Sequence, residues 1–151
     1  MSERSNKDAQ SLPLVSIITV VYNNAQYIKD SIQSVLSQNY PRLQYVVIDG
    51  GSTDGTLEII EAYQNLISVF ISEPDEGIYD ALNKGIQHAS GEVVGILHSG
   101  DLFCNVNVVS ASIKQMRETD SEFCFSDMVI VSNVSGKIVR YYMSHYFRRW
   151  M

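Results

Sequence analysis

Short, almost continuously apolar runs alternate along this sequence with longer segments in which apolar residues recur every three or four positions. The apolar runs are rich in β-branched residues, which is typical of strands covered on both faces of a sheet. The longer segments have the spacing of helices that pack one face against such a sheet. Strands are therefore predicted at residues 15–22, 43–48, 67–71 and 92–97, with 93–97 expected to be buried.

The predicted helices have start and stop signals at their ends. Asn23 and Asn24 can cap the first helix, which is expected to end at residues 39–41, and residues 52–54 can cap a second helix that continues to about Tyr63. Further helices are predicted at 78–89 and 107–119, and a C-terminal hairpin at 122–131 and 137–143. Strands that alternate with helices predict an α/β fold with a mostly parallel central sheet flanked by helices.

Polar residues follow each of the four predicted strands. The carboxyl ends of parallel strands line up along one edge of a sheet, and α/β folds bind their ligands there. Turn chemistry alone would explain any single polar loop, but four in succession favour a binding site. The segments concerned are residues 22–24, 49–52, 72–75 and 98–101.

Composition narrows the class of protein. With 151 residues, 45% of them hydrophobic, the chain is expected to form a single domain. Its net charge of -6 argues against nucleic-acid binding. Cys104 and Cys124 lack metal-ligand spacing and are expected to be buried free thiols. No apolar run approaches the length of about 20 residues that a membrane span needs, and the first residues are not a signal peptide, so a cytoplasmic location is expected.

An excess of carboxylates marks the middle of the chain. Residues 43–83 contain eight Asp or Glu and no Lys or Arg. Such a surface would repel a phosphorylated substrate unless a divalent cation lay between them, and Mg²⁺ and Mn²⁺ take oxygen ligands from both carboxylates and phosphates. The sequence therefore predicts a metal-bridged nucleotide, with Asp101, just past the fourth strand, as the candidate ligand.

Two other nucleotide-binding motifs are excluded. Gly50 and Gly55 have the spacing of the glycines in a P-loop, but Thr56 stands where the phosphate-binding lysine is required. The Gly-x-Gly-x-x-Gly pattern of dinucleotide-binding folds follows none of the predicted strands.

Four blocks of the sequence, taken in order, resemble those of a family 2 glycosyltransferase with the Rossmann-like GT-A nucleotide-sugar-binding fold. The blocks are residues 15–23, 48–56, 72–85 and 91–101, and the resemblance runs from Pro13 to about Phe103. The sequence is similar in particular to bacterial members that build exopolysaccharide, capsule or O-antigen. The resemblance implies a nucleotide-diphosphate sugar donor, Mn²⁺ or Mg²⁺ as cofactor, and transfer with inversion at the anomeric carbon to a glycan or lipid-linked acceptor.

The resemblance also implies roles for single residues. Asp101 matches the metal-ligating last Asp of the Asp-x-Asp region, and His98 stands at the first position of that region, as a second metal ligand, a sugar contact or an ordinary turn residue. Tyr22 matches the residue that packs on the nucleobase, with a core residue that closes the strand as the alternative. Asp49 matches the first Asp of an Asp-Asp-Gly-Ser loop, whose second Asp is Gly50 here. The remaining expected donor-binding residues are Asn23, Ser52, Asp75, Asp80, Lys84, Ser99 and Gly100.

The expected organisation is a disordered segment at 1–12, a GT-A nucleotide-diphospho-sugar-binding domain at 13–135, and a connector at 136–151 toward a missing acceptor-binding half. In the family the general base is an Asp or Glu downstream of the metal motif. None of the later carboxylates lies in the family's acidic-pair motif, so the base is expected to be absent. These carboxylates are Glu118, Asp120, Glu122 and Asp127.

Two functions of different class follow from these expectations. The first is an inverting glycosyltransferase, or its donor-binding half, in surface polysaccharide synthesis. The second is a non-catalytic nucleotide-sugar-binding or assembly module, whose basic aromatic tail at residues 141–150 docks a partner chain or lipid headgroups. The tail implies either peripheral contact with the cytoplasmic membrane face or self-association.

Overall fold

The computed structural model describes residues 12–144 of the chain, which divides into two compact units between Ser110 and Ala111. Residues 1–11 of the expected disordered segment and residues 145–151 of the expected connector lie outside the described residues. The basic aromatic tail predicted as a docking surface therefore also lies mostly outside them. No helix among residues 12–144 is long and apolar enough to cross a membrane.

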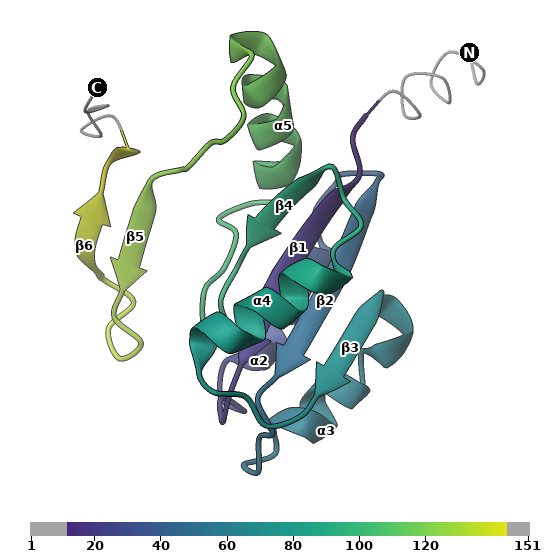
Figure 1. The fold of residues 1–151 in the computed structure, drawn as a ribbon. Helices are drawn as coiled ribbons and strands as arrows, with labels where there is room; N and C mark the ends of the chain where they lie inside the picture. Colours follow the sequence, from purple (N-terminus) through teal and green to yellow (C-terminus); the bar gives the residue numbers. More distant parts are fainter. Residues whose placement is uncertain (1–11, 145–151) are drawn as a thin grey trace. The chain divides into compact units, whose positions relative to one another are not determined.

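The first unit is a four-stranded parallel sheet with helices on both faces (Figure 1). Its elements confirm the predicted strands and helices to within a few residues. In chain order they are β1 (Val15–Val21), α2 (Ile28–Leu36), β2 (Leu43–Asp49), α3 (Thr56–Glu61), the 3-10 helix η1 (Gln64–Leu66), β3 (Val69–Ser72), α4 (Ile78–His88) and β4 (Val93–Ile96). A last helix, α5 (Val108–Thr119), begins in this unit and continues into the second.

The register of the sheet brings the strand ends together. The order is β3-β2-β1-β4, and every neighbouring pair is parallel. β1 and β2 pair from Val15↔Leu43 to Val21↔Asp49, and β3 continues the row with Asp49↔Ser72. The loops that follow the four strands therefore emerge at one edge of the sheet, as predicted.

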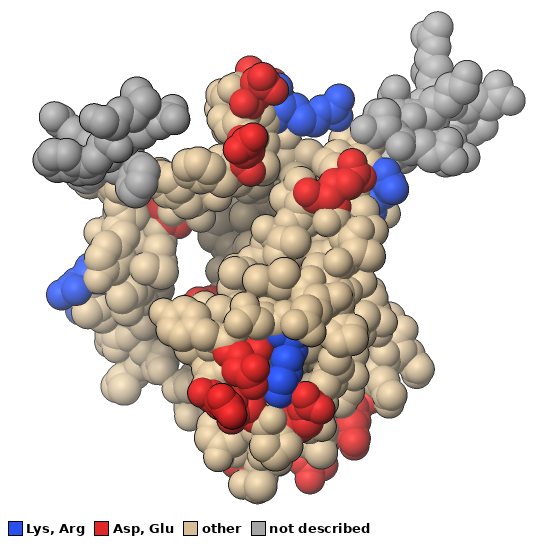
Figure 2. All heavy atoms as spheres, in the orientation of Figure 1, with Lys and Arg blue, Asp and Glu red and all other residues tan. Residues whose placement is uncertain are grey.

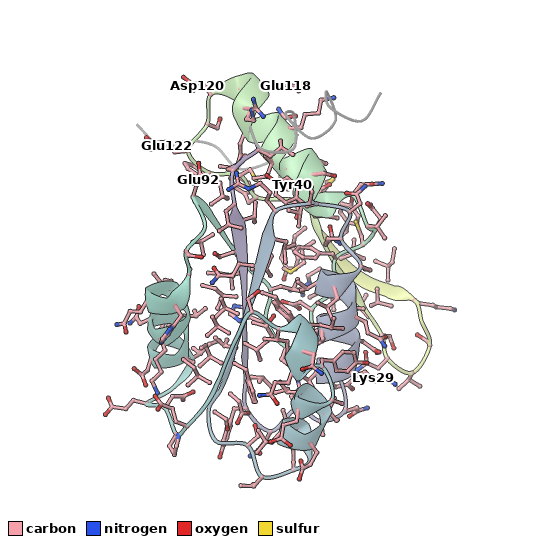
Figure 3. The ribbon with its side chains drawn as sticks, turned by 90° about the vertical axis from the view of Figure 1, so that its right-hand side faces the viewer. Lys29, Tyr40, Glu92, Glu118, Asp120 and Glu122 are labelled. Atoms are coloured by element: carbon pink, nitrogen blue, oxygen red, sulfur yellow. The ribbon has the colours of Figure 1, made fainter. Side chains whose placement is uncertain are left out.

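One face of the sheet packs against α4 (Figures 1 and 3). The core there is formed by Ile18, Val20, Val46 and Ile48 with Ala81 of α4. A Cβ atom at Gly85 would lie 2.5 Å from Cγ2 of Ile18. Because Ile18 is fully buried and β-branched, it has little room to move, so a glycine is needed for α4 to approach this closely.

The opposite face is covered by α2 and α3. Ile28, Ile32 and Ile60 of these helices are fully buried, as is Tyr45 of β2. The Tyr45 hydroxyl donates a hydrogen bond of 3.1 Å to Oγ1 of Thr19, which satisfies both polar groups inside the core. Burial raises the pKa of Tyr45 to about 12, and the hydrogen bond to Thr19 acts in the opposite direction.

The start of β1 is fixed at the other end of the sheet, where Figure 3 shows Tyr40 and Glu92. The Tyr40 hydroxyl donates to the carbonyl of Pro13 at 2.7 Å, and the Glu92 carboxylate accepts the N–H of Leu14 at 3.1 Å. These bonds lie at the end of the sheet opposite the loops expected to bind ligand.

Two expectations about burial are wrong. β4 is an edge strand, and its Val94 and Ile96 are 43% and 49% exposed, because no further strand pairs with β4 among the described residues. An edge strand and a buried strand can have the same apolar composition, so periodicity did not distinguish them. Cys104 and Cys124 are exposed free thiols, since both lie in irregular segments outside any helix or strand.

The second unit contains the predicted C-terminal hairpin. β5 (Met128–Val131) and β6 (Ile138–Tyr142) pair antiparallel, with an irregularity between Ile130 and Val131. The Asp127 carboxylate accepts hydrogen bonds from the Tyr141 hydroxyl at 3.0 Å and from the N–H of Ser144 at 2.7 Å. The hydrogen bond to the Asp127 carboxylate also raises the pKa of Tyr141. This carboxylate therefore stabilises the hairpin.

Tyr45 is expected to make stability depend on alkaline pH. The folded chain keeps the phenol protonated to about pH 12, whereas the unfolded chain loses the proton above its ordinary pKa of 10.0. The contribution of Tyr45 is therefore complete below pH 10 and should fall by about 1.4 kcal/mol per pH unit as the pH rises through this interval. Urea unfolding of the wild type and of Tyr45→Phe between pH 9 and 12 measures the difference, and parallel curves would contradict the expectation.

Candidate functional site

The loops after β1 and β2 are joined by four hydrogen bonds at the carboxyl edge of the sheet. Two of them connect Asn23 to residues 52 and 53, and two connect Asn24 and Ala25 to residues 54–56. They are Asn23 N–H to Ser52 Oγ (2.8 Å), Thr53 N–H to Asn23 Oδ1 (2.8 Å), Asn24 N–H to Thr56 Oγ1 (2.8 Å) and Ala25 N–H to Asp54 Oδ2 (3.0 Å). Asn23 adopts a φ of +47°, which Asn tolerates better than most residues.

Asp54 terminates this network at the start of α3. Its carboxylate accepts the Thr56 hydroxyl and, at 3.0 Å, the Thr56 N–H. The hydrogen bond from the Thr56 hydroxyl, followed by that from Ala25 N–H, lowers the pKa of Asp54. The cap predicted at residues 52–54 is wrong, because Gly55 occupies the N-cap position with a φ of +96° and no side chain makes a cap hydrogen bond there.

Asp49 is completely buried at the end of β2. Its carboxylate accepts four hydrogen bonds, from Gly51 N–H at 3.2 Å, Ser52 N–H at 3.0 Å, the Ser52 hydroxyl and the Ser72 hydroxyl at 2.7 Å. A buried carboxylate is tolerated only when such partners replace water. Asp49 therefore shapes the loop after β2 and ties it to the end of β3.

Gly50 leaves room for the carboxylate of Asp75. A Cβ atom at residue 50 would overlap Oδ2 of Asp75, whose Oδ1 accepts the N–H of Gly77 at 2.9 Å. The glycine that replaces an expected second Asp therefore has a steric reason, because a side chain there would displace Asp75.

The ammonium group of Lys84 contacts oxygen atoms of the protein itself. Its Nζ lies 3.0 Å from Glu73 Oε1 and 3.3 Å from Asp80 Oδ2, and it donates to the carbonyl of Pro74 at 3.1 Å. Glu73 and then Asp80 raise the pKa of Lys84, whereas Glu76 N–H and then Lys84 lower the pKa of Asp80. In the lower part of Figure 2, Asp and Glu side chains gather with atoms of Lys or Arg between them. Lys84 thus fastens the loop after β3 to α4.

A tight turn follows β4 and presents Asp101. The N–H of Asp101 donates to the carbonyl of His98 at 2.9 Å, and Gly100 has a φ of +98°, as a type II turn requires at its third residue. Nδ2 of Asn24 donates to Oγ of Ser99 at 2.8 Å, so this turn is attached to the loop after β1. The strand-end residues predicted to form one site are therefore joined by hydrogen bonds within the first unit.

Asp101 differs from most of the other acidic residues of this edge. Asp49, Asp54, Glu73, Asp75 and Asp80 all have hydrogen bonds or ion pairs. Within residues 12–144, the exposed carboxylate of Asp101 has none. These carboxylates thus have partners within the protein, although only Lys84 among these partners carries a positive charge, whereas Asp101 is available to a cation.

His98 and Tyr22 also present groups without protein partners. Nδ1 of His98 is the one buried side-chain nitrogen or oxygen in the described part of the chain that lacks a hydrogen bond. Tyr22 is 64% exposed, which excludes the alternative that it is a core residue closing β1. No group of three or more His, Cys, Asp or Glu that could hold a metal occurs within residues 12–144. A cation there would therefore need further ligands from a bound molecule or water.

Sequence reasoning missed the residues that support this edge from α2. Ser31 and Ser34 bond to the segment after β4, and Asn24 connects the loops after β1, β2 and β4. The row of polar side chains beside the apolar face of α2 was the available signal, but the sequence does not show which loop they meet.

Comparison with known proteins identifies relatives of both the sequence and the fold. Residues 16–150 match the family model described as Glycosyl transferase family 2. The putative teichuronic acid biosynthesis glycosyltransferase TuaG of Bacillus subtilis is 35% identical over 117 residues, which cover 76% of this chain and 46% of TuaG. The chain spans less than half the length of the curated relatives it matches.

Two solved structures share the fold. Staphylococcus aureus TarS 1-349 in complex with UDP-GlcNAc superimposes with a TM-score of 0.66 at 28% identity, covering 84% of this chain and 37% of TarS. The mannosyltransferase PcManGT from Pyrobaculum calidifontis, in complex with GDP-Man and Mn²⁺, gives a TM-score of 0.66 at 23% identity, covering 84% and 38%. The GT-A fold expected from the sequence is confirmed.

Asp49→Ala is expected to destabilise the first unit strongly. It would leave the N–H groups of Gly51 and Ser52 and the Ser72 hydroxyl without their acceptor, at a cost of about 3 kcal/mol or more in the free energy of unfolding. Urea unfolding measures the change. Glu61→Ala, which removes an exposed carboxylate of α3, is the control and should stay within about 0.5 kcal/mol of the wild type. Equal effects of the two substitutions would contradict a structural role for Asp49.

Proposed function

Because this chain belongs to glycosyl transferase family 2, whose model matches residues 16–150, we propose that it binds a nucleotide-diphosphate sugar at the carboxyl edge of its parallel sheet. The whole protein would transfer that sugar to a glycan or lipid-linked acceptor. The ligands named for TarS and PcManGT, UDP-GlcNAc and GDP-Man with Mn²⁺, support a donor of this class.

The observation that carries the proposal is the availability of Asp101. The neighbouring acidic loops are closed by internal hydrogen bonds, and the turn after β4 holds a carboxylate with no partner in the described residues. The buried Nδ1 of His98 lies in the same turn and also lacks a partner. The site therefore offers one charged oxygen ligand and one imidazole nitrogen within the same turn.

This donor set fits a divalent cation shared with a diphosphate. Mg²⁺ and Mn²⁺ are commonly held by one or two carboxylates together with substrate phosphates and water, rather than by a complete cage of protein ligands. Asp101 would hold the cation, and the imidazole of His98 would either ligate it or bond to the donor. When bound, the cation would stabilise the negative charge of the leaving diphosphate.

The exposed ring of Tyr22 supplies the other end of the proposed donor site. It follows β1 directly and lies beside Asn23, whose backbone and side chain are bonded to the loop after β2. An exposed aromatic face on such a fixed loop is suited to stacking on a nucleobase, as base–aromatic stacking contributes about 1–3 kcal/mol. Asp49, Lys84 and their partners would act indirectly, by holding the loops in place.

We further propose transfer by direct displacement with inversion, in surface polysaccharide synthesis at the cytoplasmic membrane face. The name of TuaG, which assigns it to teichuronic acid biosynthesis, supports this role. In such a reaction a general base takes the proton of the acceptor hydroxyl while the diphosphate leaves from the opposite side of the sugar.

Binding of a nucleoside diphosphate is expected to depend on metal through Asp101. The wild-type chain should bind UDP or GDP at least about 10-fold more tightly in Mn²⁺ than in EDTA, corresponding to roughly 1.4 kcal/mol, and Asp101→Ala should abolish this difference. Isothermal titration calorimetry with each nucleotide measures it, and Glu61→Ala serves as the control that keeps the wild-type ratio. Equal affinity of the wild type for the nucleotide in Mn²⁺ and in EDTA would contradict the proposed metal-bridged site.

Sugar transfer is expected to invert the anomeric configuration. Transfer from labelled UDP-GlcNAc or GDP-mannose to lipid-linked or glycan acceptors would be followed first, and NMR of the product would then give the configuration of the new bond. A product with the donor's own configuration would rule out direct displacement. Donor binding by the whole protein with no transfer to any acceptor would favour the non-catalytic binding module instead.

A further inference from the structure

The segment between β4 and α5 has no regular secondary structure, and α2 holds it in place. Three polar residues of α2 and the residues after it, Ser31, Ser34 and Gln38, are spaced three and four positions apart and so lie on one side of the helix. Ser34 Oγ accepts the N–H of Phe103 at 2.7 Å, and Gln38 Nε2 donates to the carbonyl of Asn105 at 2.8 Å. In a strand or helix, the backbone N–H and C=O groups of this segment would bond to other backbone groups. Here they bond to side chains of α2 and of Gln38, which follows it.

Ser31 is the member of this row that reaches the proposed metal turn. It is completely buried, and its hydroxyl makes two bonds to adjacent residues of that turn. Oγ accepts the N–H of Gly100 at 2.9 Å and donates to the carbonyl of Asp101 at 3.0 Å. A carbonyl of its own helix, that of Tyr27, lies farther from the hydroxyl at 3.5 Å. One hydroxyl thus fixes the backbone on both sides of the Gly100–Asp101 peptide.

These two bonds matter because the other attachments of the turn to the rest of the unit are made at Ser99, whose N–H donates to the carbonyl of Val20 at 3.3 Å and whose Oγ accepts Nδ2 of Asn24 at 2.8 Å. Within the turn, a single backbone hydrogen bond, from Asp101 N–H to the carbonyl of His98, closes it. Gly100 has more conformational freedom than any other residue type would have at that position. A cation ligand has to be held to within about 0.5 Å of its working position to be effective. Without the Ser31 hydroxyl, the Asp101 carboxylate would sample positions away from the cation.

We propose that Ser31 is a positioning residue for the cation site, acting through the backbone of Asp101 without touching the nucleotide. This inference rests on the proposed function, because it concerns the metal dependence of donor binding. It predicts that the hydroxyl of Ser31 affects the Mn²⁺-dependent part of the affinity and leaves the metal-independent part unchanged.

The test compares the wild type with its variants by one quantity, the ratio of the Kd in EDTA to the Kd in Mn²⁺. Both constants are measured by calorimetry with UDP and with GDP as probes. Ser31→Ala is expected to lower this ratio at least about fivefold, from the loss of two hydrogen bonds to the turn. Partial unfolding of a variant weakens binding equally in both media, so the ratio reports on the cation site and is independent of overall stability. Ser31→Thr, which keeps the hydroxyl, should restore the ratio.

Ser34→Ala is the matched control. It removes the same hydroxyl from the same helix and breaks a hydrogen bond to the same segment, but at Phe103, beyond Asp101. It should lower stability in urea as Ser31→Ala does, yet keep the wild-type ratio. Ser31→Cys keeps the volume of the buried side chain with a much weaker donor and acceptor, and replaces the alanine variant in the test should that variant fail to fold.

The outcomes separate the two proposals. A wild-type chain whose affinity is the same in Mn²⁺ and EDTA would overturn the proposed function. A wild type with a clear Mn²⁺ effect that Ser31→Ala and Ser31→Cys retain would overturn the role of Ser31 alone. Equal losses of the ratio in Ser31→Ala and Ser34→Ala would also overturn it, since the effect would then belong to the whole segment.

Discussion

The parallel pairing of β1 with a neighbour on each side determines the rest of the first unit. Because β1 lies in the middle of the sheet, its end is adjacent to the end of β2 on one side and close to the turn after β4 on the other. The loops that follow these strands are then near enough for Asn23 and Asn24 to bond to residues 52–56 and to Ser99. The register of the sheet, through these bonds, places the candidate site.

Burial of a carboxylate is the energetic cost of this arrangement. Asp49 is removed completely from water, and its four hydrogen-bond donors offset the loss of hydration. At the surface, Lys84 forms ion pairs with both Glu73 and Asp80 and balances one of their two negative charges, with the smaller gain expected of exposed ion pairs. Most acidic residues of the edge therefore organise loops. A cation site needs the reverse condition, a fixed carboxylate with no internal partner, and Asp101 meets it.

The sequence predicted the elements and the strand ends because these depend on local periodicity and on the geometry of parallel sheets. It also identified Asp101, His98 and Tyr22, whose environments in the structure leave groups available to a ligand. It could not show that Lys84 is paired with Glu73 and Asp80, because this depends on the fold of the loop after β3. It also could not show the exposure of β4, which depends on what lies beside that strand. The supporting role of Ser31 was hidden for the same reason, since its partners are about seventy residues away in the sequence.

α2 connects the stability of the core with the geometry of the site. One side of the helix buries Ile28, Ile32 and Val35 in the core, while Ser31 and Ser34 bond to the segment after β4. Close packing of the apolar side leaves the helix little freedom to shift or rotate. The hydroxyls on its polar side are therefore held as firmly as the core itself. A turn that lacks regular secondary structure thereby acquires the rigidity of the sheet and helices around it, which a site for a small cation requires.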